Sequence, residues 1–412
     1  MTERSAAPDE SAGPVAVALT EPRDGVPAPL TEQTDLDRVV ATLAAGHGPV
    51  AVDAERASGY RYGQSAYLVQ LRRADIGTVL IDPRELDDLA RLGRAMAGDE
   101  WVLHAASQDL PCLAELGMAP TRIFDTELAG RLLGYPRVGL GAMVEEVLGF
   151  TLEKGHSAAD WSTRPLPEPW LRYAALDVEL LVELRDELAL ELDATGKREW
   201  AEQEFAAIVA APPPLARVEP WRRTSGLHRV RKRRQLAVVR ALWERRDELA
   251  RRRDIAPGRV LPDSAIVAAA LTQPRTEAEL VALPVWGGRS MRRQTGTWLP
   301  AIDAALALPE EELPTPKAPY DGPPPARSWA EREPAAASRL AAARAAVGAV
   351  AESLAVPVEN LLAPDIVRRL TWDPPADPDE ERVADVLRAR GAREWQVGLT
   401  AAVLAEILTE NT

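Results

Sequence analysis

The sequence predicts an α/β or α+β domain, in which a sheet is packed by helices, followed by two small all-α domains. The first observation is a group of four short apolar segments with strand character near the start of the chain. The second is a pair of proline-rich stretches, 211–220 and 309–327, which are typical of linkers and divide the chain into 31–210, 221–308 and 328–412. The third is a similarity between the last two of these blocks.

In the first block, strand patterns precede helix patterns. Strands are expected at 49–55, 66–73, 77–83 and 101–105, and the short connections among the first three favour antiparallel pairing. Helices are expected at 107–117, 125–134, 139–149 and from about 169 to 192. Residues 1–30 are rich in Ala, Pro, Asp and Glu, and we expect them to be disordered.

The two helical blocks are similar to one another at an offset of 100 residues. Each contains a long helix pattern, then a proline and a second apolar helix pattern, and residues 257–271 align with residues 357–371. An internal duplication of a small helical domain is the simplest explanation.

Composition restricts the class of protein. The chain has 412 residues, of which 46% are hydrophobic, so a globular protein of two to four domains is expected. Cys112 is the only cysteine, which excludes an intrachain disulfide framework and favours the reducing cytoplasm. No apolar run of about 18 residues occurs in the sequence. We therefore expect a cytoplasmic monomer without a membrane partner.

The charge is strongly segregated along the chain. The formal net charge of −14 argues against a nucleic-acid partner. Yet residues 222–253 hold thirteen Lys and Arg against three acids, so this segment is strongly basic in an acidic chain. Within it, 229-RVRKRR-234 is not spaced for pairing with acids, which favours phosphate contacts by Arg231, Lys232, Arg233 and Arg234. A solvated helix whose arginines provide solubility is the alternative.

Two acids stand at the end of the first predicted strand. Asp53 and Glu55 follow the apolar run 49-PVAV-52 and share one face of the strand, because side chains two residues apart point the same way. Like charges on one face repel each other unless a cation lies between them or one is protonated. A strand end with two solvated acids is the alternative.

Further acids occur at defined positions. Tyr173 and Asp177 are four residues apart and lie on one helix face within an apolar sequence. Asp109 falls in the first turn of a helix that follows a strand, where the helix dipole alone would favour an acid. Asp125 has the same explanation, and we interpret it as a helix cap.

The order of these acids, with a tyrosine one turn before the last, resembles the DEDD superfamily of 3′→5′ exonucleases. The wider sequence is similar to the ribonuclease D family over about residues 45–200. The matching segments are 53-DAE-55, 66-AYLVQL-71, 104-HAASQDL-110, 125-DTELAGRLLG-134, 151-TLEKGHSAADWSTRPL-166 and 173-YAALD-177. The helical blocks 221–308 and 328–412 resemble HRDC domains, the first more closely.

The resemblance implies a ribonuclease H-like exonuclease domain at 31–210, with a mixed sheet flanked by helices, and two HRDC-like domains. Two departures from the family pattern occur. Ala54 stands where the family often has Thr, at a position that should point away from the site. Arg172 stands where one branch of the family has His, which assigns this chain to the tyrosine branch.

The resemblance also implies a two-metal mechanism with Mg²⁺ or Mn²⁺, since such hard ions prefer oxygen ligands. Asp53, Glu55 and Asp177 would hold the ion that activates water. Asp53 and Asp109 would hold the other ion, and Tyr173 would orient the attacking water. The expected activity is a 3′→5′ exoribonuclease that trims structured RNA such as tRNA precursors.

Other residues are candidates for nucleic-acid contacts. Lys154, Ser157 and Trp161 match the ribonuclease D segment before the last helix and would approach the terminal nucleotides, with loop packing as the alternative. Tyr62 and Gln64 could stack on or bond to a terminal base. A 3′→5′ DNA exonuclease and a non-catalytic nucleic-acid-binding adaptor are the competing functions; an intact carboxylate set disfavours the adaptor.

Overall fold

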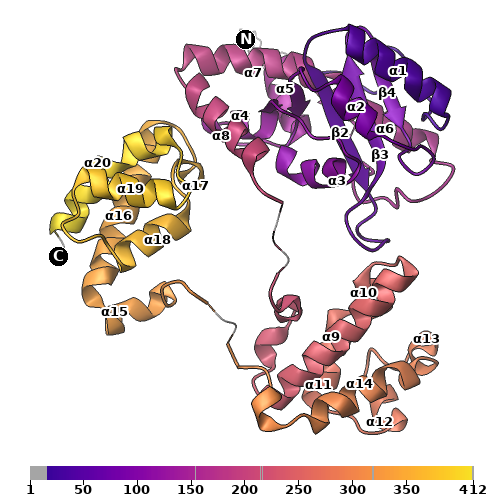
Figure 1. Ribbon diagram of the computed structural model, residues 1–412, viewed down its shortest axis with the longest axis vertical. Helices are drawn as coiled ribbons and strands as arrows, with labels where there is room; N and C mark the ends of the chain where they lie inside the picture. The colour runs from indigo at the N-terminus through magenta and orange to yellow at the C-terminus, as the bar shows by residue number, and fades with distance from the viewer. Residues whose placement is uncertain (1–15, 154, 214, 216, 318–319, 411–412) are drawn as a thin grey trace, which may run out of the picture.

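The computed structural model describes residues 16–153, 155–213, 215, 217–317 and 320–410, and it has one α/β domain and two helical domains (Figure 1). The α/β domain is built on a five-stranded sheet in the order β4-β3-β2-β5-β6. Its strands are β2 (Val50–Arg56), β3 (Ala66–Arg73), β4 (Gly77–Ile81), β5 (Trp101–Leu103) and β6 (Ile123–Asp125). β2, β3 and β4 pair antiparallel, whereas β2, β5 and β6 pair parallel. The mixed sheet that the sequence predicted is confirmed.

Helices cover both faces of this sheet. They are α1 (Gln33–Ala45), α2 (Ala90–Ala95), the 3₁₀ turn η1 (Ala106–Gln108), α3 (Leu110–Glu115), α4 (Thr126–Leu133), α5 (Leu140–Leu148), α6 (Glu168–Glu179), α7 (Leu181–Ala194) and α8 (Arg198–Ala210). Helix α6 lies against β2, β3 and β4. The helix expected at 169–192 is therefore two helices, because the backbone leaves helical geometry at Leu180 (φ −114°, ψ 8°). The break gives α6 and α7 separate packing directions.

The side chains of β2 alternate between the two faces of the sheet. Val50, Val52 and Ala54 belong to the main hydrophobic core. Ala51 lies on the other face, in a cluster with Val178. Because Asp53 and Glu55 follow Ala51 at intervals of two, they also lie on the α6 face.

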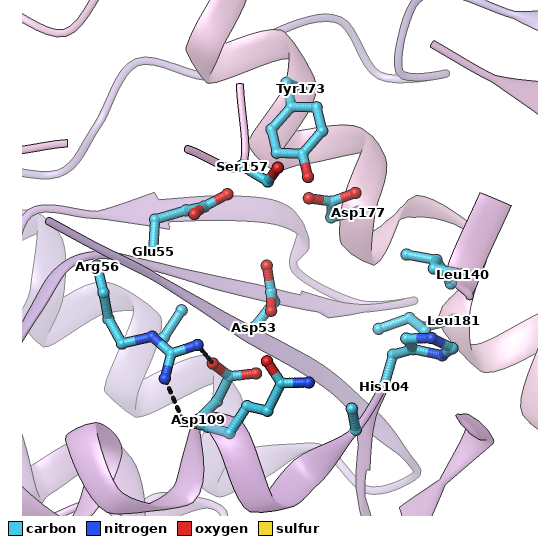
Figure 2. A pocket seen from close by; sticks show the side chains of 13 residues that line it. Asp53, Glu55, Arg56, His104, Asp109, Leu140, Ser157, Tyr173, Asp177 and Leu181 are labelled. Carbon is cyan, nitrogen blue, oxygen red and sulfur yellow. Dashed lines mark hydrogen bonds and ion pairs between the residues drawn. The ribbon is translucent and has the colours of Figure 1, made fainter. Parts of the chain in front are cut away.

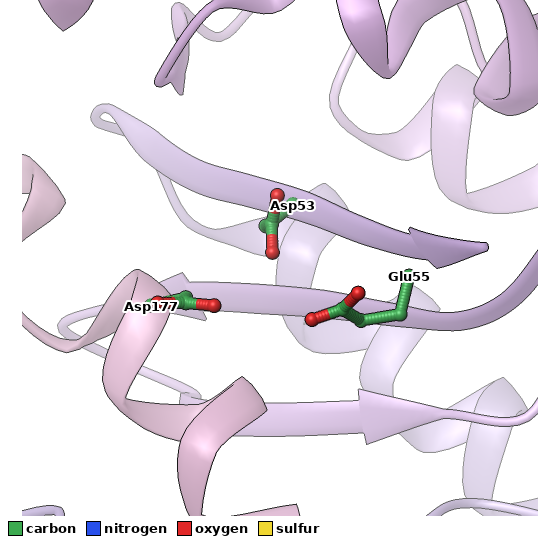
Figure 3. Close-up of side chains that lie close together, drawn as sticks. All are labelled: Asp53, Glu55 and Asp177. Atoms are coloured by element: carbon green, nitrogen blue, oxygen red, sulfur yellow. The ribbon is translucent and has the colours of Figure 1, made fainter. Parts of the chain in front are cut away.

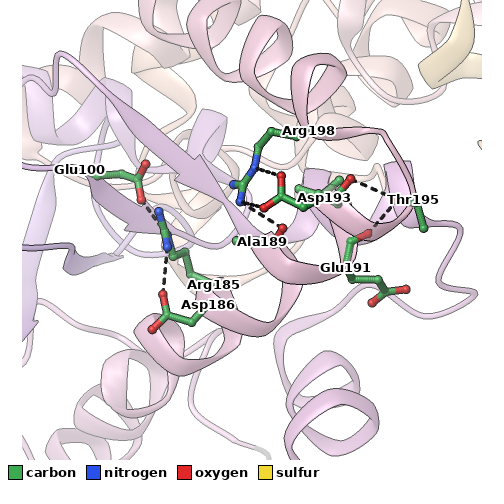
Figure 4. A network of polar contacts seen from close by, with 9 residues as sticks. Glu100, Arg185, Asp186, Ala189, Glu191, Asp193, Thr195 and Arg198 are labelled. Carbon is green, nitrogen blue, oxygen red and sulfur yellow. Dashed lines mark hydrogen bonds and ion pairs between the residues drawn. The ribbon is translucent and has the colours of Figure 1, made fainter.

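Helix α7 is fixed to the sheet by polar contacts at its outer side (Figure 4). The Arg185 guanidinium donates to Glu100, the residue before β5, at 2.7 Å. Near the end of α7, Arg198 donates to Asp193 and to the Ala189 carbonyl. These contacts join α7 to β5 and to α8.

The described part of the N-terminal segment packs on the α/β domain. Strand β1 (Val17–Leu19) pairs in parallel with β7 (Phe150–Leu152), and Leu30 forms a bridge to β4. Arg23 lies 3.8 Å from the carboxylate of Glu179, which is fully buried. The expectation of disorder for residues 1–30 is therefore wrong for residues 16–30, because strand pairing and this ion pair hold them. Residues 1–15 lie outside the described residues.

Each helical domain contains a long helix that follows two short helical elements. The first contains η2 (Pro220–Arg223), η3 (Leu227–Arg229), α9 (Arg233–Arg253), α10 (Pro257–Val260), α11 (Asp263–Thr272), α12 (Glu277–Val281), α13 (Arg289–Arg292), α14 (Thr295–Ala307) and η4 (Glu310–Glu312). The second contains η5 (Ala326–Ser328), α15 (Trp329–Arg332), α16 (Pro334–Ser353), α17 (Val358–Leu361), α18 (Pro364–Trp372), α19 (Glu380–Ala389) and α20 (Glu394–Glu410). The sequence long helix, single turn, helix occurs in both, as α9-α10-α11 and α16-α17-α18.

The two helical domains attach to the α/β domain differently. The first has a hydrophobic core of its own, which includes Trp286 and Trp298. The second shares a continuous core with the α/β domain, and Trp395 of α20 stacks on Trp200 of α8 with ring centroids 4.9 Å apart. In the described part of the chain, none of the helices is both long and apolar enough to cross a membrane.

Candidate active site

Three carboxylates meet between the sheet and helix α6 (Figure 3). Asp53 and Glu55 project from the end of β2, and Asp177 projects from α6. Each of the three offers an oxygen, and these oxygens all lie within 4.8 Å of one another. Asp53 and Glu55 are close in the sequence, whereas Asp177 follows Glu55 by 122 residues, so folding brings α6 to the end of β2.

Asp109 is the fourth carboxylate of the same cavity (Figure 2). This cavity has a volume of about 290 Å³ and is lined by all four acids and by Tyr173. Asp53 lies close enough to Asp109 for its charge to raise the pKa of the Asp109 carboxyl. It lies at the junction of η1 and α3, where the helix dipole favours an acid, so this part of the sequence interpretation also holds.

A buried cap supports the turn that presents Asp109. The carboxylate of Asp125 accepts hydrogen bonds from the backbone N–H groups of Glu127 and Leu128 at the start of α4. It also accepts from Ala105 and Ala106, where Ala105 has a left-handed backbone conformation (φ 60°). The interpretation of Asp125 as a helix cap is confirmed, and the same carboxylate holds η1 in place.

Tyr173 lies one turn before Asp177 and directs its hydroxyl at that carboxylate (Figure 2). Its ring belongs to an apolar cluster with the fully buried Trp161. The ring also makes an edge contact with His156, at a centroid separation of 6.0 Å. The hydroxyl is therefore held at the cavity by rigid packing of the ring.

Burial raises the pKa values of the four acids, and repulsion by neighbouring acids adds to the rise for Glu55, Asp109 and Asp177. Loss of solvation, together with the charges of Asp53 and Asp177, raises the pKa of Glu55 from 4.5 to about 10. Burial, followed by the charge of Asp53, raises the pKa of Asp109 to about 8. The pKa values of Asp53 and Asp177 are also raised, by burial first. A cation among these oxygens would lower the pKa values of the acids, because it favours the charged form of each carboxylate.

The set of donors fits hard divalent cations. Among the described residues, the group that could hold a metal ion consists of carboxylates alone, without His or Cys. Oxygen-only sites suit Mg²⁺ and Mn²⁺ rather than zinc or copper. His104 lines the cavity, but burial lowers its pKa to about 4 and its Nδ1 bonds to Thr126, so it is a neutral structural side chain.

A second cavity adjoins the first and shares Glu55, Arg56, Gln108 and Ser157 with it. Its volume is about 410 Å³, and its other lining residues come from the loop after β2 and from the segment at 158–159. Ser157 and Gln64, two of the residues that could contact the terminal nucleotides, both line this cavity. Lys154 lies outside the described residues.

Tyr62 lies in a contact between domains instead of in either cavity. Its hydroxyl donates to Asp247 of α9 at 3.0 Å, and the guanidinium of Arg251 lies over its ring. Its ring packs against the core of the first helical domain. This differs from the expected stacking on a base, because the hydroxyl and the ring already have protein partners.

The basic segment divides into paired and exposed side chains. Arg233 donates to the carbonyls of Glu310 and Leu313, and Arg234 donates to carbonyls at the end of α14. Arg231 and Lys232 are exposed, and their side chains make no hydrogen bond or ion pair with any residue that the structure describes. The same holds for four further arginines: Arg223, Arg229, Arg252 and Arg253. The expected phosphate contacts therefore remain available to Arg231 and Lys232, whereas Arg233 and Arg234 tie the domain together.

Sequence reasoning missed Arg56, although it follows Glu55 directly. Its Nη2 lies 3.3 Å from Asp109 Oδ1, and its Nη1 donates to the Gln108 carbonyl. An arginine one residue after a pair of acids on a strand was the available signal. The pairing register of β2 shifts between Glu55 and Arg56, so strict alternation does not hold there, and the length of the Arg56 side chain lets its guanidinium reach the cavity.

Family models match three parts of the chain. The model described as 3′-5′ exonuclease matches residues 27–193, and the HRDC domain model matches residues 235–302. A model described as 3′ to 5′ exonuclease C-terminal domain matches residues 322–408.

Curated relatives and solved structures agree with these matches. Ribonuclease D of Acidiphilium cryptum is 32% identical over 320 residues, covering 74% of this chain and 80% of the relative. Ribonuclease D of Escherichia coli is 32% identical over 273 residues, covering 65% and 72%. The crystal structure of the Escherichia coli enzyme superposes with a TM-score of 0.67 at 26% identity, covering 92% of this chain and 98% of that one. A crystal structure of a protein from Bifidobacterium adolescentis superposes with a TM-score of 0.89 at 40% identity, covering 96% and 100%.

Proposed function

The chain belongs to the ribonuclease D family, and we propose that it is a metal-dependent 3′→5′ exoribonuclease that removes nucleotides from RNA by hydrolysis. The observation that carries the proposal is the convergence of Asp53, Glu55, Asp109 and Asp177 on one cavity beside the hydroxyl of Tyr173. An adaptor that only binds nucleic acid would have no need of four clustered acids, two of them buried and two half-buried, whose charges oppose folding.

In this proposal Asp53, Glu55 and Asp177 would hold one divalent cation, and Asp53 and Asp109 would hold a second. Bound there, two such ions would supply an activated water and stabilisation of the leaving 3′ oxygen. The chain's own carboxylates would fix the positions of the ions, and oxygen ligands of this type suit Mg²⁺ and Mn²⁺. Asp53 lies next to both groups of ligands, which suits it to bridge the ions.

Tyr173 orients the attacking water through its hydroxyl. The ring is fixed by Trp161 and His156, so the hydroxyl has little freedom. The hydroxyl is directed at the Asp177 carboxylate, one helical turn along α6 (Figure 2). A group held in this way lowers the entropy cost of aligning water with the phosphorus.

The proposed substrate is structured RNA with a free 3′ end, such as a tRNA precursor. The Escherichia coli relative is described as an exoribonuclease involved in structured RNA processing. In this chain the RNA end would enter the two adjoining cavities, and the exposed basic residues of α9 would hold the body of the RNA. The buried free thiol of Cys112 suits the reducing cytoplasm, where we place this activity.

The position of α9 supports this path for the RNA. The loop after β2, which lines the second cavity, contacts the end of α9 and the segment that follows it: the Tyr60 carbonyl accepts from Ala256 N–H, and the Gly59 carbonyl accepts from Arg259. The exposed Arg252 and Arg253 therefore lie near the cavities, and α9 extends from there over about 30 Å at 1.5 Å per residue.

The activity is tested by incubating the protein with 5′-labelled and 3′-labelled RNA and DNA in Mg²⁺, Mn²⁺ or EDTA. Stepwise shortening of 5′-labelled RNA, immediate release of a 3′ label and no reaction in EDTA are expected. Loss of a 5′ label as the first product would refute the proposed direction. Faster digestion of DNA than of RNA of the same sequence would favour the alternative function of a DNA exonuclease.

The role of the basic residues is tested with the double variant Arg231→Gln/Lys232→Gln. For every phosphate that the variant no longer binds, the salt dependence of RNA binding should flatten by about 0.7 in the log–log slope. Affinity for long RNA should fall, whereas cleavage of a short oligonucleotide at saturation should not change. Arg332→Gln/Arg390→Gln, which removes two exposed arginines of the second helical domain, is the matched control. If the salt dependence of RNA binding has the same slope in both double variants, Arg231 and Lys232 contribute only to solubility.

A further inference from the structure

Arg56 is the only Lys or Arg among the described residues that line the carboxylate cavity. Its Nη2 is 3.3 Å from Asp109 Oδ1, and the side chains are 25% and 7% exposed, respectively. Figure 2 shows the guanidinium directed at Asp109 from the side opposite Tyr173 and Asp177. A tethered cation therefore already partners one of the four acids.

This pairing distinguishes Asp109 from the other three acids. The oxygens of Asp53, Glu55 and Asp177 form one compact group, to which Asp109 does not belong. The Arg56 charge acts on Asp109 in the direction opposite to that of Asp53. A divalent cation shared by Asp53 and Asp109 would have to share the Asp109 carboxylate with the guanidinium, since both cations bind the same small group.

Arg56 also lines the second cavity, beside Ser58, Gly59 and Gln64. The guanidinium thus lies at the boundary between the two cavities. An RNA strand whose terminal nucleotide reaches the four acids has its backbone in this boundary region. Arginine is well suited to a phosphate there, because its planar fork donates two parallel hydrogen bonds to phosphate oxygens.

The main chain around Arg56 is fixed, so that only the side chain is free to move. Residue 56 closes β2 and pairs with Ala66 of β3. The loop that follows is held to the first helical domain through Gly59, Tyr60 and an ion pair between Arg61 and Asp254. The flexible part is the arginine side chain, which can rotate between two partners without a backbone change.

We propose that Arg56 is an exchangeable counter-ion: it pairs with Asp109 until a divalent cation takes that carboxylate, and then binds a phosphate of the RNA at the boundary between the two cavities. The inference rests on the proposed function and adds a coupling to it. RNA that draws the guanidinium away strengthens binding of the ion at Asp109. By reciprocity, the ion strengthens binding of RNA by the same factor.

The variants Arg56→Gln and Arg56→Lys test the exchange, with Mn²⁺ binding to the full chain measured by calorimetry in the absence of RNA. Arg56→Gln should bind the weaker of the two Mn²⁺ ions about 5- to 20-fold more tightly than wild type, since the competing charge is gone. Arg56→Lys keeps a positive charge beside Asp109, so its affinity for this Mn²⁺ ion should stay close to that of wild type. Arg61→Gln, which removes an arginine of the same loop outside the carboxylate cavity, is the control and should bind Mn²⁺ as wild type does.

A second readout measures RNA. Binding of an RNA with a non-hydrolysable 3′ phosphorothioate linkage should tighten Mn²⁺ binding at the weaker site in wild type, and this coupling should disappear in Arg56→Gln. The KM of Arg56→Gln for RNA should rise about tenfold, with a smaller change in kcat. Arg56→Lys should also lose much of the coupling, because it lacks the bidentate fork.

Unchanged or weaker Mn²⁺ binding by Arg56→Gln would overturn the exchange, and so would coupling that survives the substitution. If Arg56→Gln does not fold, loss of coupling in folded Arg56→Lys supports the proposal and full retention refutes it. Failure of wild type to bind two ions would instead refute the proposed function, so the two failures are distinguishable.

Discussion

Replacing Asp177 with Asn should make the ion-free protein more stable while nearly abolishing its activity. The substitution preserves the shape of the side chain and an oxygen that can accept from the Tyr173 hydroxyl. It removes one of three like charges whose oxygens lie within 4.8 Å of one another. Stability and activity should therefore change in opposite directions.

The size of the effect follows from the separation of the charges. Two unit charges separated by 4.8 Å repel by roughly 3 kcal/mol at an effective dielectric constant of about 20. Protons held by these acids at neutral pH already offset part of this repulsion, as the raised pKa values show. We therefore expect a gain of about 1–3 kcal/mol in the free energy of unfolding, or roughly 2–10 °C in Tm.

Thermal unfolding in EDTA and in Mn²⁺ provides the assay, together with digestion of 5′-labelled RNA. The wild-type Tm should rise on addition of Mn²⁺, whereas the Asp177→Asn variant should show a higher Tm in EDTA, a smaller rise with Mn²⁺ and at least a ~100-fold loss of activity. Asp125→Asn is the matched control, because it makes the same change from Asp to its neutral amide in the same domain. It should lose about 1–2 kcal/mol, since Asp125 caps a helix and has hydrogen-bond donors around it instead of acids.

The reasoning about Asp177 would be refuted by either of two results. One is near-wild-type turnover of Asp177→Asn in Mg²⁺. The other is a loss of stability in EDTA comparable to that of Asp125→Asn, which would show that Asp177 has a structural role and is not held against repulsion.

Three further predictions concern Tyr173, Glu55 and the contact between the second helical domain and the α/β domain. Tyr173→Phe should lower kcat by about 10- to 100-fold, because the hydroxyl orients the attacking water. Binding of Mn²⁺, measured by calorimetry, should not change, because the hydroxyl is not a metal ligand. A loss of Mn²⁺ binding would contradict this prediction. The pKa of Glu55 in the folded protein, about 10, lies above its ordinary 4.5, so the folded ion-free protein binds more protons than the unfolded chain between these pH values. Its free energy of unfolding, measured in urea, should therefore fall as pH rises from 6 to 9 in EDTA but not in saturating Mg²⁺. The same pH dependence in EDTA and in Mg²⁺ would contradict this prediction. Trp395→Ala removes the stack on Trp200 and the hydrogen bond to Glu204, so it should lower the free energy of unfolding by about 3–5 kcal/mol. In calorimetry, the second helical domain should then unfold in a separate transition at lower temperature. A single unshifted transition would contradict a shared core.

The sheet and the first two acids could be predicted from local sequence patterns. Strand alternation alone placed Asp53 and Glu55 on one face, and in the structure both lie on the face that α6 covers. The cap at Asp125 was predictable because helix starts have a strong local signal. The convergence of Asp109 and Asp177 with this pair could not follow from periodicity, since it depends on where α3 and α6 pack. Only the order of motifs in a known family predicted it.

Elements that depend on tertiary contacts were missed. Strands β6 and β7 have three residues each, too short for a periodic pattern, and β1 is a strand because β7 lies beside it. The break at Leu180 has no proline or glycine to mark it. Local charge counting also failed to separate Arg233 from Lys232, because the partners of Arg233 come from residues about 80 positions later in the chain.

The central claim, that four carboxylates of this cavity hold two divalent cations, is tested most directly by anomalous scattering from crystals grown with Mn²⁺. The account predicts two Mn²⁺ ions roughly 3.5–4 Å apart, one bound by Asp53, Glu55 and Asp177 and the other between Asp53 and Asp109. A single ion, ions bound outside this cavity, or a cavity that stays empty at saturating Mn²⁺ would contradict it.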